Sequence, residues 1–220
     1  MYTLFGFKGS GSAAVECALE MTGADYRIVE AASWEKNAAL EELARVNPLQ
    51  QIPTLLLPDG TVLTESAAIL MHLGLAFPDS GLLSGEPSAR DLALRGLVYI
   101  AANCYSCISI CDYPERYTTM TDEAALAAVR AAARATLHRH WDIFADLNPV
   151  PAGGFFLGGD QPGALDLLAA VVSKWSGTRA HLKASRPAFS ALLERIDSNP
   201  AVALVFGRHW QTAAEIPTGA

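Results

Sequence analysis

Apolar and polar positions follow two different rhythms along the chain. In the first third, short apolar runs at residues 2–6 and 26–29 predict β-strands. Between and after them, apolar residues and alanines recur at helical spacing over 13–21 and 34–46. This part of the chain therefore alternates strands and helices.

A hairpin signal follows. Two β-rich runs, 54–57 and 61–63, flank Pro58-Asp59-Gly60, in which proline presets φ and glycine accepts a positive φ. Helical spacing returns over 65–75. The order β-α-β-α-β-β-α predicts an α+β domain with a mixed four-stranded sheet, because crossovers give parallel pairs and the hairpin an antiparallel one.

The rhythm changes after a segment rich in proline, glycine and serine. Beyond it we find helical spacing only, over 91–110, 122–147, 164–175, 187–197 and a shorter stretch at 199–206. We therefore expect a first domain at 1–77, a linker at 78–89 and an all-α bundle at 90–220.

Composition narrows the class of protein. Hydrophobic residues make up 51% of the 220 residues and charged residues 18%, which suits a globular protein. The net charge of −7 and the lack of a basic run argue against nucleic-acid binding. Since no apolar stretch approaches 20 residues and the start does not resemble a secretory signal, we expect no membrane segment and a cytoplasmic protein with four reduced cysteines.

A glycine-serine loop, Gly9-Ser10-Gly11-Ser12, opens the first predicted helix. Backbone N–H groups and hydroxyls beside a positive helix end stabilise an anion, including a thiolate. Capping is the other explanation, because Ser12 suits the N-cap position of the helix that follows.

Two further segments carry candidate chemistry. Pro53 opens a strand after Gln51 and Ile52, and a cis Ile52–Pro53 bond would aim the Ile52 backbone outward to pair with an extended peptide. Glu65 and Ser66 stand where a strand meets a helix. They can cap that helix or hold the amine and carboxylate of a ligand.

Together these segments resemble the glutathione S-transferase superfamily, in particular its cytosolic, bacterial-type members with a serine loop. The resemblance lies in NPLQQIPTL (47–55), PDGTVLTESAAI (58–69) and the linker into helices. It implies a thioredoxin-like domain followed by an all-α domain, usually in a homodimer. It also implies glutathione as co-substrate, no metal, and a detoxifying transferase that attacks a small apolar electrophile.

The resemblance also implies roles for single residues. Pro53 would be cis, with the Ile52 backbone on the cysteinyl part of glutathione and Gln51 near the glycyl carboxylate. Glu65 and Ser66 would hold the γ-glutamyl end.

The residue that contacts the sulfur stays open. Many relatives have a hydroxyl residue where this chain has Gly9, which leaves Ser10 or Ser12, and we favour Ser10 because Ser12 can cap the helix. The lack of a cysteine in this loop argues against thiol exchange. Glutathione-dependent isomerisation, ether cleavage or peroxide reduction, and a non-catalytic interaction module, remain alternatives.

The helical part carries weaker signals. The segment around Asn103, Tyr105 and Tyr113 matches the helix that lines the electrophile pocket in the family, so these three are pocket candidates. Cys104, Cys107 and Cys111 share a helical stripe, which we interpret as core. Gly163 and Asp166 match the family's capping motif.

The histidines offer little evidence of function. We expect His138 and His140 to be solvated, and the sequence identifies no partner for His72, His181 or His209.

Overall fold

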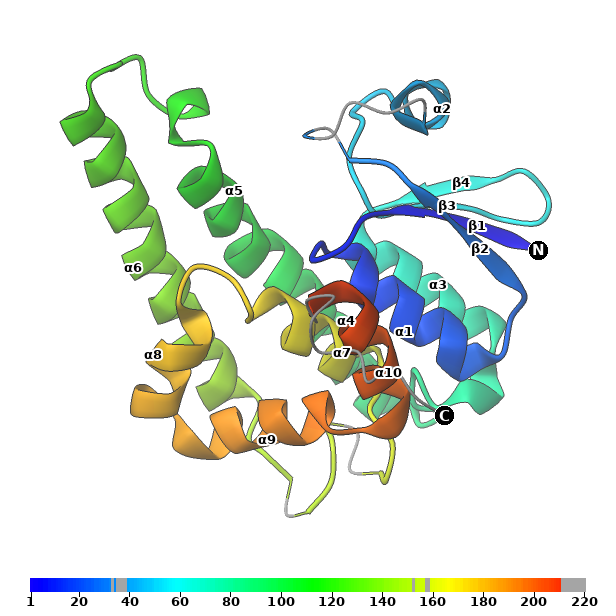
Figure 1. Ribbon diagram of the computed structural model, residues 1–220. Coiled ribbons are helices and arrows are strands. Elements are labelled where there is room, and N and C mark those ends of the chain that lie inside the picture. The colour runs from blue at the N-terminus through cyan, green and yellow to red at the C-terminus, as the bar shows by residue number, and fades with distance from the viewer. Residues whose placement is uncertain (33, 35–38, 152, 157–158, 211–220) are drawn as a thin grey trace, which may run out of the picture. The chain divides into compact units, whose positions relative to one another are not determined.

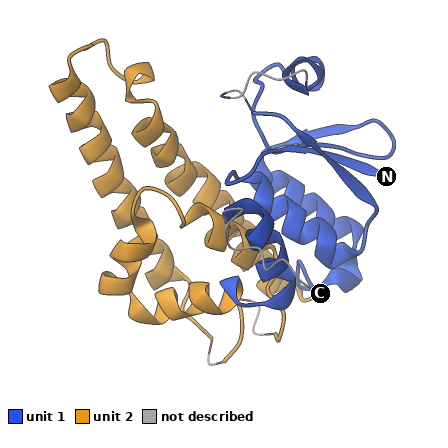
Figure 2. Ribbon diagram, in the orientation of Figure 1, with its two compact units in different colours: residues 1–85, 197–220 blue, residues 86–196 orange. Residues whose placement is uncertain are grey.

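The protein is described by a computed structural model, in which residues 1–32, 34, 39–151, 153–156 and 159–210 are placed. Packing divides the chain into two compact units: residues 1–85 with 197–220, and residues 86–196 (Figure 2). The last helix thus packs with the first unit, whereas its place in the chain assigned it to the helical domain.

The first unit is built on a four-stranded sheet in the order β2-β1-β3-β4 (Figure 1). β1 and β2 are parallel, and the β1–β3 and β3–β4 pairs are antiparallel. The predicted mixed sheet and element order are confirmed. Its elements are β1 (Tyr2–Gly6), α1 (Ser12–Thr22), β2 (Tyr26–Glu30), α2 (Ala39–Val46), β3 (Thr54–Leu56), β4 (Val62–Thr64), α3 (Ser66–Ala76), the short 3-10 helix η1 (Pro78–Ser80) and α10 (Pro200–Trp210).

Both faces of this sheet are covered. Leu4 and Phe5 are adjacent on β1 and therefore point to opposite faces, yet both are buried. Phe5 packs with Leu43 of α2, while α1 and α3 pack together on the other face (Figure 1). α10 packs along α1. Of the predicted helix at 34–46, residues 35–38 lie outside the described part.

The second unit consists of helices and connecting loops, with no strand among its described residues. It comprises α4 (Pro87–Tyr99), the π-helix η2 (Ile100–Tyr105), α5 (Ser106–Asp112), the 3-10 helix η3 (Pro114–Arg116), α6 (Glu123–Leu147), α7 (Ala164–Val172), α8 (Thr178–Ser185) and α9 (Pro187–Asp197). The all-α prediction for this region is confirmed. Two details differ: the helix predicted over 91–110 contains the π-helical segment, and α8 was missed because it buries only Thr178 and Leu182.

The run from α4 to α5, Pro87–Asp112, is 26 residues long with a best-window mean hydropathy of 1.3. By length and composition alone it could cross a membrane, whereas the sequence predicted no such segment. Length and composition do not separate a spanning helix from a core helix of a globular protein. Here the run packs against α6 and α7.

Candidate functional site

The strand register brings the three candidate loops to one edge of the sheet. Phe5 pairs with Thr54, and Thr54 pairs with Thr64. The chain therefore leaves β1, enters β3 and leaves β4 at the same edge, across two strand spacings of about 5 Å each. The glycine-serine loop, the Ile52–Pro53 segment and the Glu65–Ser66 junction converge there.

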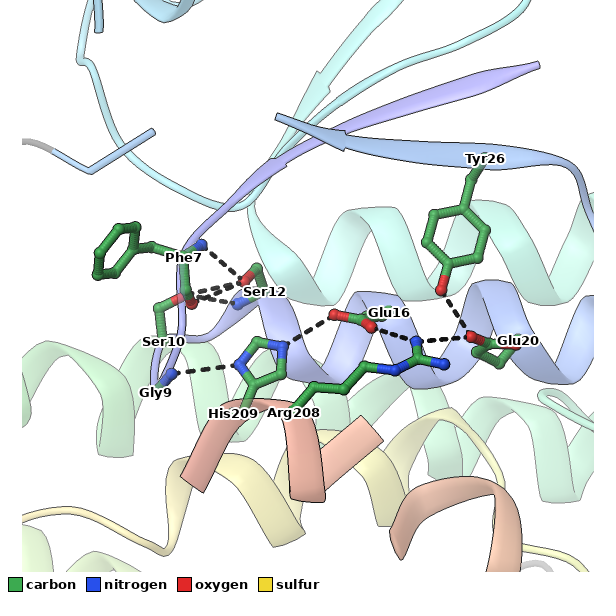
Figure 3. Close-up of polar contacts among 9 residues, drawn as sticks. All are labelled: Phe7, Gly9, Ser10, Ser12, Glu16, Glu20, Tyr26, Arg208 and His209. Carbon is green, nitrogen blue, oxygen red and sulfur yellow. Dashed lines mark hydrogen bonds and ion pairs between the residues drawn. The ribbon is translucent and has the colours of Figure 1, made fainter. Parts of the chain in front are cut away.

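In the first loop, Ser12 does not cap α1, contrary to the expectation. Gly11 is the N-cap residue and no side chain bonds to the cap, because the Ser12 hydroxyl turns back toward β1. It accepts the Phe7 N–H (3.2 Å), donates to the Phe7 carbonyl (3.3 Å) and lies 2.8 Å from the Ser10 hydroxyl (Figure 3). Gly6 permits this contact, since a Cβ there would lie 2.6 Å from Ser12.

The hydroxyl protons separate the two serines. Ser12 is 2% exposed, and its oxygen already faces Phe7 on both sides as well as Ser10. Ser10 is 7% exposed and accepts the Ser12 N–H (3.2 Å). The Ser12 hydroxyl has one proton, which goes either to the Phe7 carbonyl or to Ser10, and only in the second case is the Ser10 proton available to a third group. Ser10 is therefore the more accessible of the two hydroxyls, and its oxygen has fewer partners within the protein than that of Ser12.

The second loop contains the expected cis Ile52–Pro53 peptide bond. Asn47, 3% exposed, holds the loop: its Nδ2 donates to the Gln51 carbonyl (3.0 Å) and to Thr54 Oγ1 (2.9 Å). Among the described residues, the Ile52 backbone N–H and carbonyl have no hydrogen-bond partner. Gln51 is exposed. Sequence analysis assigned Asn47 no separate role, because no local pattern shows that its amide spans the loop.

The third junction leaves a helix start unsatisfied. Glu65 is the N-cap of α3, with φ 64° and ψ 110°, and its side chain makes no cap hydrogen bond. Capping by Glu65 is therefore wrong. A left-handed φ costs a non-glycine residue about 1 kcal/mol or more. The Glu65 carboxylate is exposed, and neither it nor the Ser66 hydroxyl bonds to a described residue.

The start of α3 also offers backbone donors. Its first intrahelical bond runs from the Ile69 N–H to the Glu65 carbonyl (2.9 Å), so the N–H groups of residues 66–68 precede the ladder. Such groups carry positive partial charge and bind anions. A carboxylate acceptor for amines and a cluster of N–H donors for anions thus stand side by side.

The three pocket candidates in the second unit are spread along one helical run. The Asn103 side chain donates to the Tyr99 carbonyl (3.1 Å), and Tyr105 packs on Trp175 with ring centroids 5.8 Å apart. Tyr113 lies at the end of α5 beneath the Arg116 guanidinium (4.0 Å). Ten residues of helix separate Asn103 from Tyr113, about 15 Å. Their role stays a prediction.

His140 contacts the π-helix. The Nδ1 atom of His140 donates to the carbonyl of Asn103 (2.8 Å), a residue of the π-helix. His138 bonds to the Ser176 carbonyl (3.1 Å) and stacks on His181. His138 and His140 are therefore half-buried, and each bonds to a residue remote in the sequence, where the sequence analysis expected solvated side chains.

The cysteines are core residues, as expected. All four are buried, and burial raises the pKa of each thiol. Within the described ranges no group of three or more metal-binding side chains occurs.

Known proteins share this arrangement. Residues 1–74 match the family model described as glutathione S-transferase, N-terminal domain. The uncharacterized GST-like protein YncG of Escherichia coli K12 is 35% identical over 118 residues, 53% of this chain and 57% of YncG, so the chain spans little more than half of that relative. Glutathione S-transferase GstA of Escherichia coli O157:H7 is 31% identical over 143 residues, 63% of this chain and 71% of GstA.

Solved structures extend the likeness over both units. A sphingomonad glutathione S-transferase complexed with glutathione has a TM-score of 0.74 and 26% identity, and the alignment covers 96% of this chain and all of that one. The family model, the relatives and the solved structures agree on the same family. The chain belongs to the glutathione S-transferase family.

Proposed function

We propose that this protein binds glutathione at the edge formed by its three loops, activates the thiol, and transfers the glutathionyl group to a small apolar electrophile. One observation carries the proposal. At a single edge, the protein presents an exposed carboxylate, unpaired backbone groups at Ile52 and helix-start donors at α3.

Glutathione has the size and charges that these groups would recognise. The edge spans two strand spacings, about 10 Å, which is the length of an extended tripeptide. Glu65 would bind the α-ammonium group, while Ser66 and the first N–H groups of α3 bind the neighbouring carboxylate. The Ile52 backbone would pair with the cysteinyl residue as an added strand, and Gln51 would reach the glycyl carboxylate.

The chemistry then rests on the glycine-serine loop. A free thiol with a pKa near 8.5 is only about 3% ionised at neutral pH. Donation from Ser10, with the start of α1 behind it, stabilises the thiolate and lowers the thiol pKa, by one unit for each ~1.4 kcal/mol. The thiol proton leaves to solvent, and the thiolate attacks the electrophile, whose leaving group departs with the bonding electrons.

The remaining expectations belong to the same proposal. Asn103, Tyr105 and Tyr113 would line the electrophile pocket, in which case their substitution raises KM for the electrophile and leaves glutathione affinity unchanged. The protein would act as a cytoplasmic homodimer.

Calorimetry with glutathione tests the proposal, using wild type, Glu65→Gln and the control Glu41→Gln. Glu41 is an exposed carboxylate on α2, in a surface ion pair with Arg45 (3.8 Å). We expect Glu65→Gln to weaken binding about tenfold or more, since it removes a charged hydrogen bond. Glu41→Gln should bind as wild type.

Ultraviolet difference absorbance of the bound thiolate and turnover of a chloroaromatic substrate complete the test. Thiolate at neutral pH together with turnover supports the transferase. Binding without thiolate would replace it by a carrier, and no binding at millimolar glutathione would leave an interaction module.

A further inference from the structure

A buried polar chain connects the last helix to the glycine-serine loop (Figure 3). The Gly9 N–H donates to His209 Nδ1 (3.2 Å), and His209 Nε2 lies 2.9 Å from a carboxylate oxygen of Glu16. Arg208 bridges Glu16 and Glu20, at 2.8 Å to each. Two hundred residues of sequence separate Gly9 from His209.

The hydrogen bonds determine the state of the imidazole. A backbone N–H can only donate, so Nδ1 of His209 must be the acceptor and carries no proton. The ring proton is then on Nε2 and is donated to the Glu16 carboxylate. His209 is therefore neutral and oriented by Glu16, because a cationic ring would have no lone pair for Gly9.

Glu16 is the buried group to which both His209 and Arg208 bind. Its side chain is 2% exposed and that of His209 is 6% exposed. Burial opposes ionisation of Glu16, but hydrogen bonds from His209 and Arg208 outweigh burial and lower its pKa. A buried carboxylate needs such partners, and Arg208 alone already supplies a charged one.

The ion pair between Glu16 and Arg208 does not explain why His209 contacts Gly9. Anchoring α10 to α1 needs only Glu16 and Arg208, yet His209 directs its second nitrogen to the loop. Gly9 has φ +70°, a left-handed conformation, and Ser10 is the next residue. The Gly9 peptide therefore sets the direction in which the chain presents Ser10.

We propose that His209 is a positioning residue for the thiolate site: held by Glu16, its Nδ1 fixes the Gly9 peptide and thereby aims the Ser10 hydroxyl at the glutathione sulfur. The inference rests on the proposed function, in that Ser10 is the group that contacts the sulfur. It assigns to α10 a part in the reaction that no local sequence pattern indicates.

Two amide substitutions separate the two ends of the imidazole. His209→Asn places an amide oxygen near the position of Nδ1 and can still accept from Gly9. His209→Gln places an amide nitrogen near the position of Nε2 and can still donate to Glu16, but it offers nothing to Gly9. Arg208→Gln is the matched control, because it weakens the same buried carboxylate and leaves the loop contact intact.

The thiol pKa of bound glutathione is the readout, titrated by ultraviolet difference absorbance. We expect His209→Gln to raise this pKa and lower the thiolate fraction at neutral pH about five- to tenfold, the effect of losing one hydrogen bond. His209→Asn should recover most of the signal. Arg208→Gln should lower the unfolding midpoint and leave the thiol pKa at the wild-type value.

Other results would overturn the inference. A wild-type thiol pKa in His209→Gln, or an equal shift in Arg208→Gln, would reduce His209 to an anchor of α10. A wild type that forms no thiolate would instead remove the proposed function, which keeps the two failures apart. If His209→Gln does not fold, ¹⁵N NMR of the wild-type imidazole decides: the neutral tautomer protonated at Nε2 is expected, and any other form contradicts the chain described above.

Discussion

Helices begin differently at the sheet edge and in the helical unit. α1 and α3 open without any side-chain cap, although a serine or glutamate stands at each start. In the helical unit, Glu86 accepts the Ala89 N–H at the start of α4, and Asp122 accepts the Ala125 N–H at the start of α6. At the start of α7, Asp166 accepts the Gly163 N–H.

The proposed glutathione site would account for the uncapped start of α3. The first N–H groups of any helix have no partner within it and must find one elsewhere. α4 and α6 have carboxylate caps from their own chain, and α10 of the first unit likewise begins with Asn199, which accepts the Ala201 N–H. α7 and α8 begin at Gly163 and Gly177 and have no side-chain cap. At α1 the Ser12 N–H donates to the Ser10 hydroxyl and the Ala13 N–H to the Ser10 carbonyl. The first N–H groups of α3 have no partner among the described residues, which is what an anionic ligand requires.

The largest loss of stability should come from removing the buried carboxylate at the start of α7. Asp166 is fully buried and accepts the Gly163 N–H (2.9 Å) and the Phe156 N–H (3.1 Å). The expected hydrogen bond from Asp166 back to the N-cap residue is therefore present, whereas Gly163 has no side chain to cap the helix. Asp166→Ala would leave two buried donors unpaired. We expect a loss of about 3 kcal/mol in the free energy of unfolding, measured by urea denaturation.

Asp122→Ala is its control, because Asp122 caps α6 at an exposed position. It should cost only about 1 kcal/mol. Both variants should bind glutathione with wild-type affinity when folded. A cost at Asp166 no larger than that at Asp122 would contradict the importance of burial.

Ser66→Ala should do the opposite of Asp166→Ala: it should lower glutathione affinity and leave stability nearly unchanged. The Ser66 hydroxyl has no partner among the described residues, so its removal should change the free energy of unfolding by less than about 0.5 kcal/mol. Glutathione affinity should fall about tenfold, or ~1.4 kcal/mol, by calorimetry. A stability loss without an affinity loss would show that Ser66 is an ordinary structural residue.

The last test is a pair of opposite pH dependences. The pKa of Glu16 is lowered, so its contribution to stability is present above the unfolded value near 4.5 and is lost as pH falls through the folded value. Burial raises the pKa of Asp166 to about 7, so the folded state keeps its proton longer than the unfolded state. Its contribution is present at pH below about 4 and is lost as pH rises toward 7.

Urea midpoints of wild type, Glu16→Gln and Asp166→Asn between pH 3 and 8 measure this. The difference between wild type and Glu16→Gln should shrink toward acid. The difference between wild type and Asp166→Asn should shrink toward neutral pH. Parallel curves would remove the distinction between the two carboxylates.

Much of the fold could be predicted from the sequence, because the local spacing of apolar residues and the turn residues determine it. Pro58-Asp59-Gly60 specifies a hairpin whose strands the structure places at Thr54–Leu56 and Val62–Thr64. α8 escaped prediction because only two of its residues face a core, and the π-helix at Ile100–Tyr105 escaped because its sequence reads as ordinary helix.

The sequence by itself determined the element order of the first 77 residues and the all-α character of the second unit, since each depends on neighbours within a few residues. The resemblance to a known family added the three segments proposed to bind glutathione. Tertiary structure alone decided that Ser12 turns to Phe7 and leaves α1 uncapped. It also decided that His209 reaches Gly9. Hydrogen bonds between residues far apart in the chain depend on how helices and strands pack, and one sequence carries no local signal of that packing.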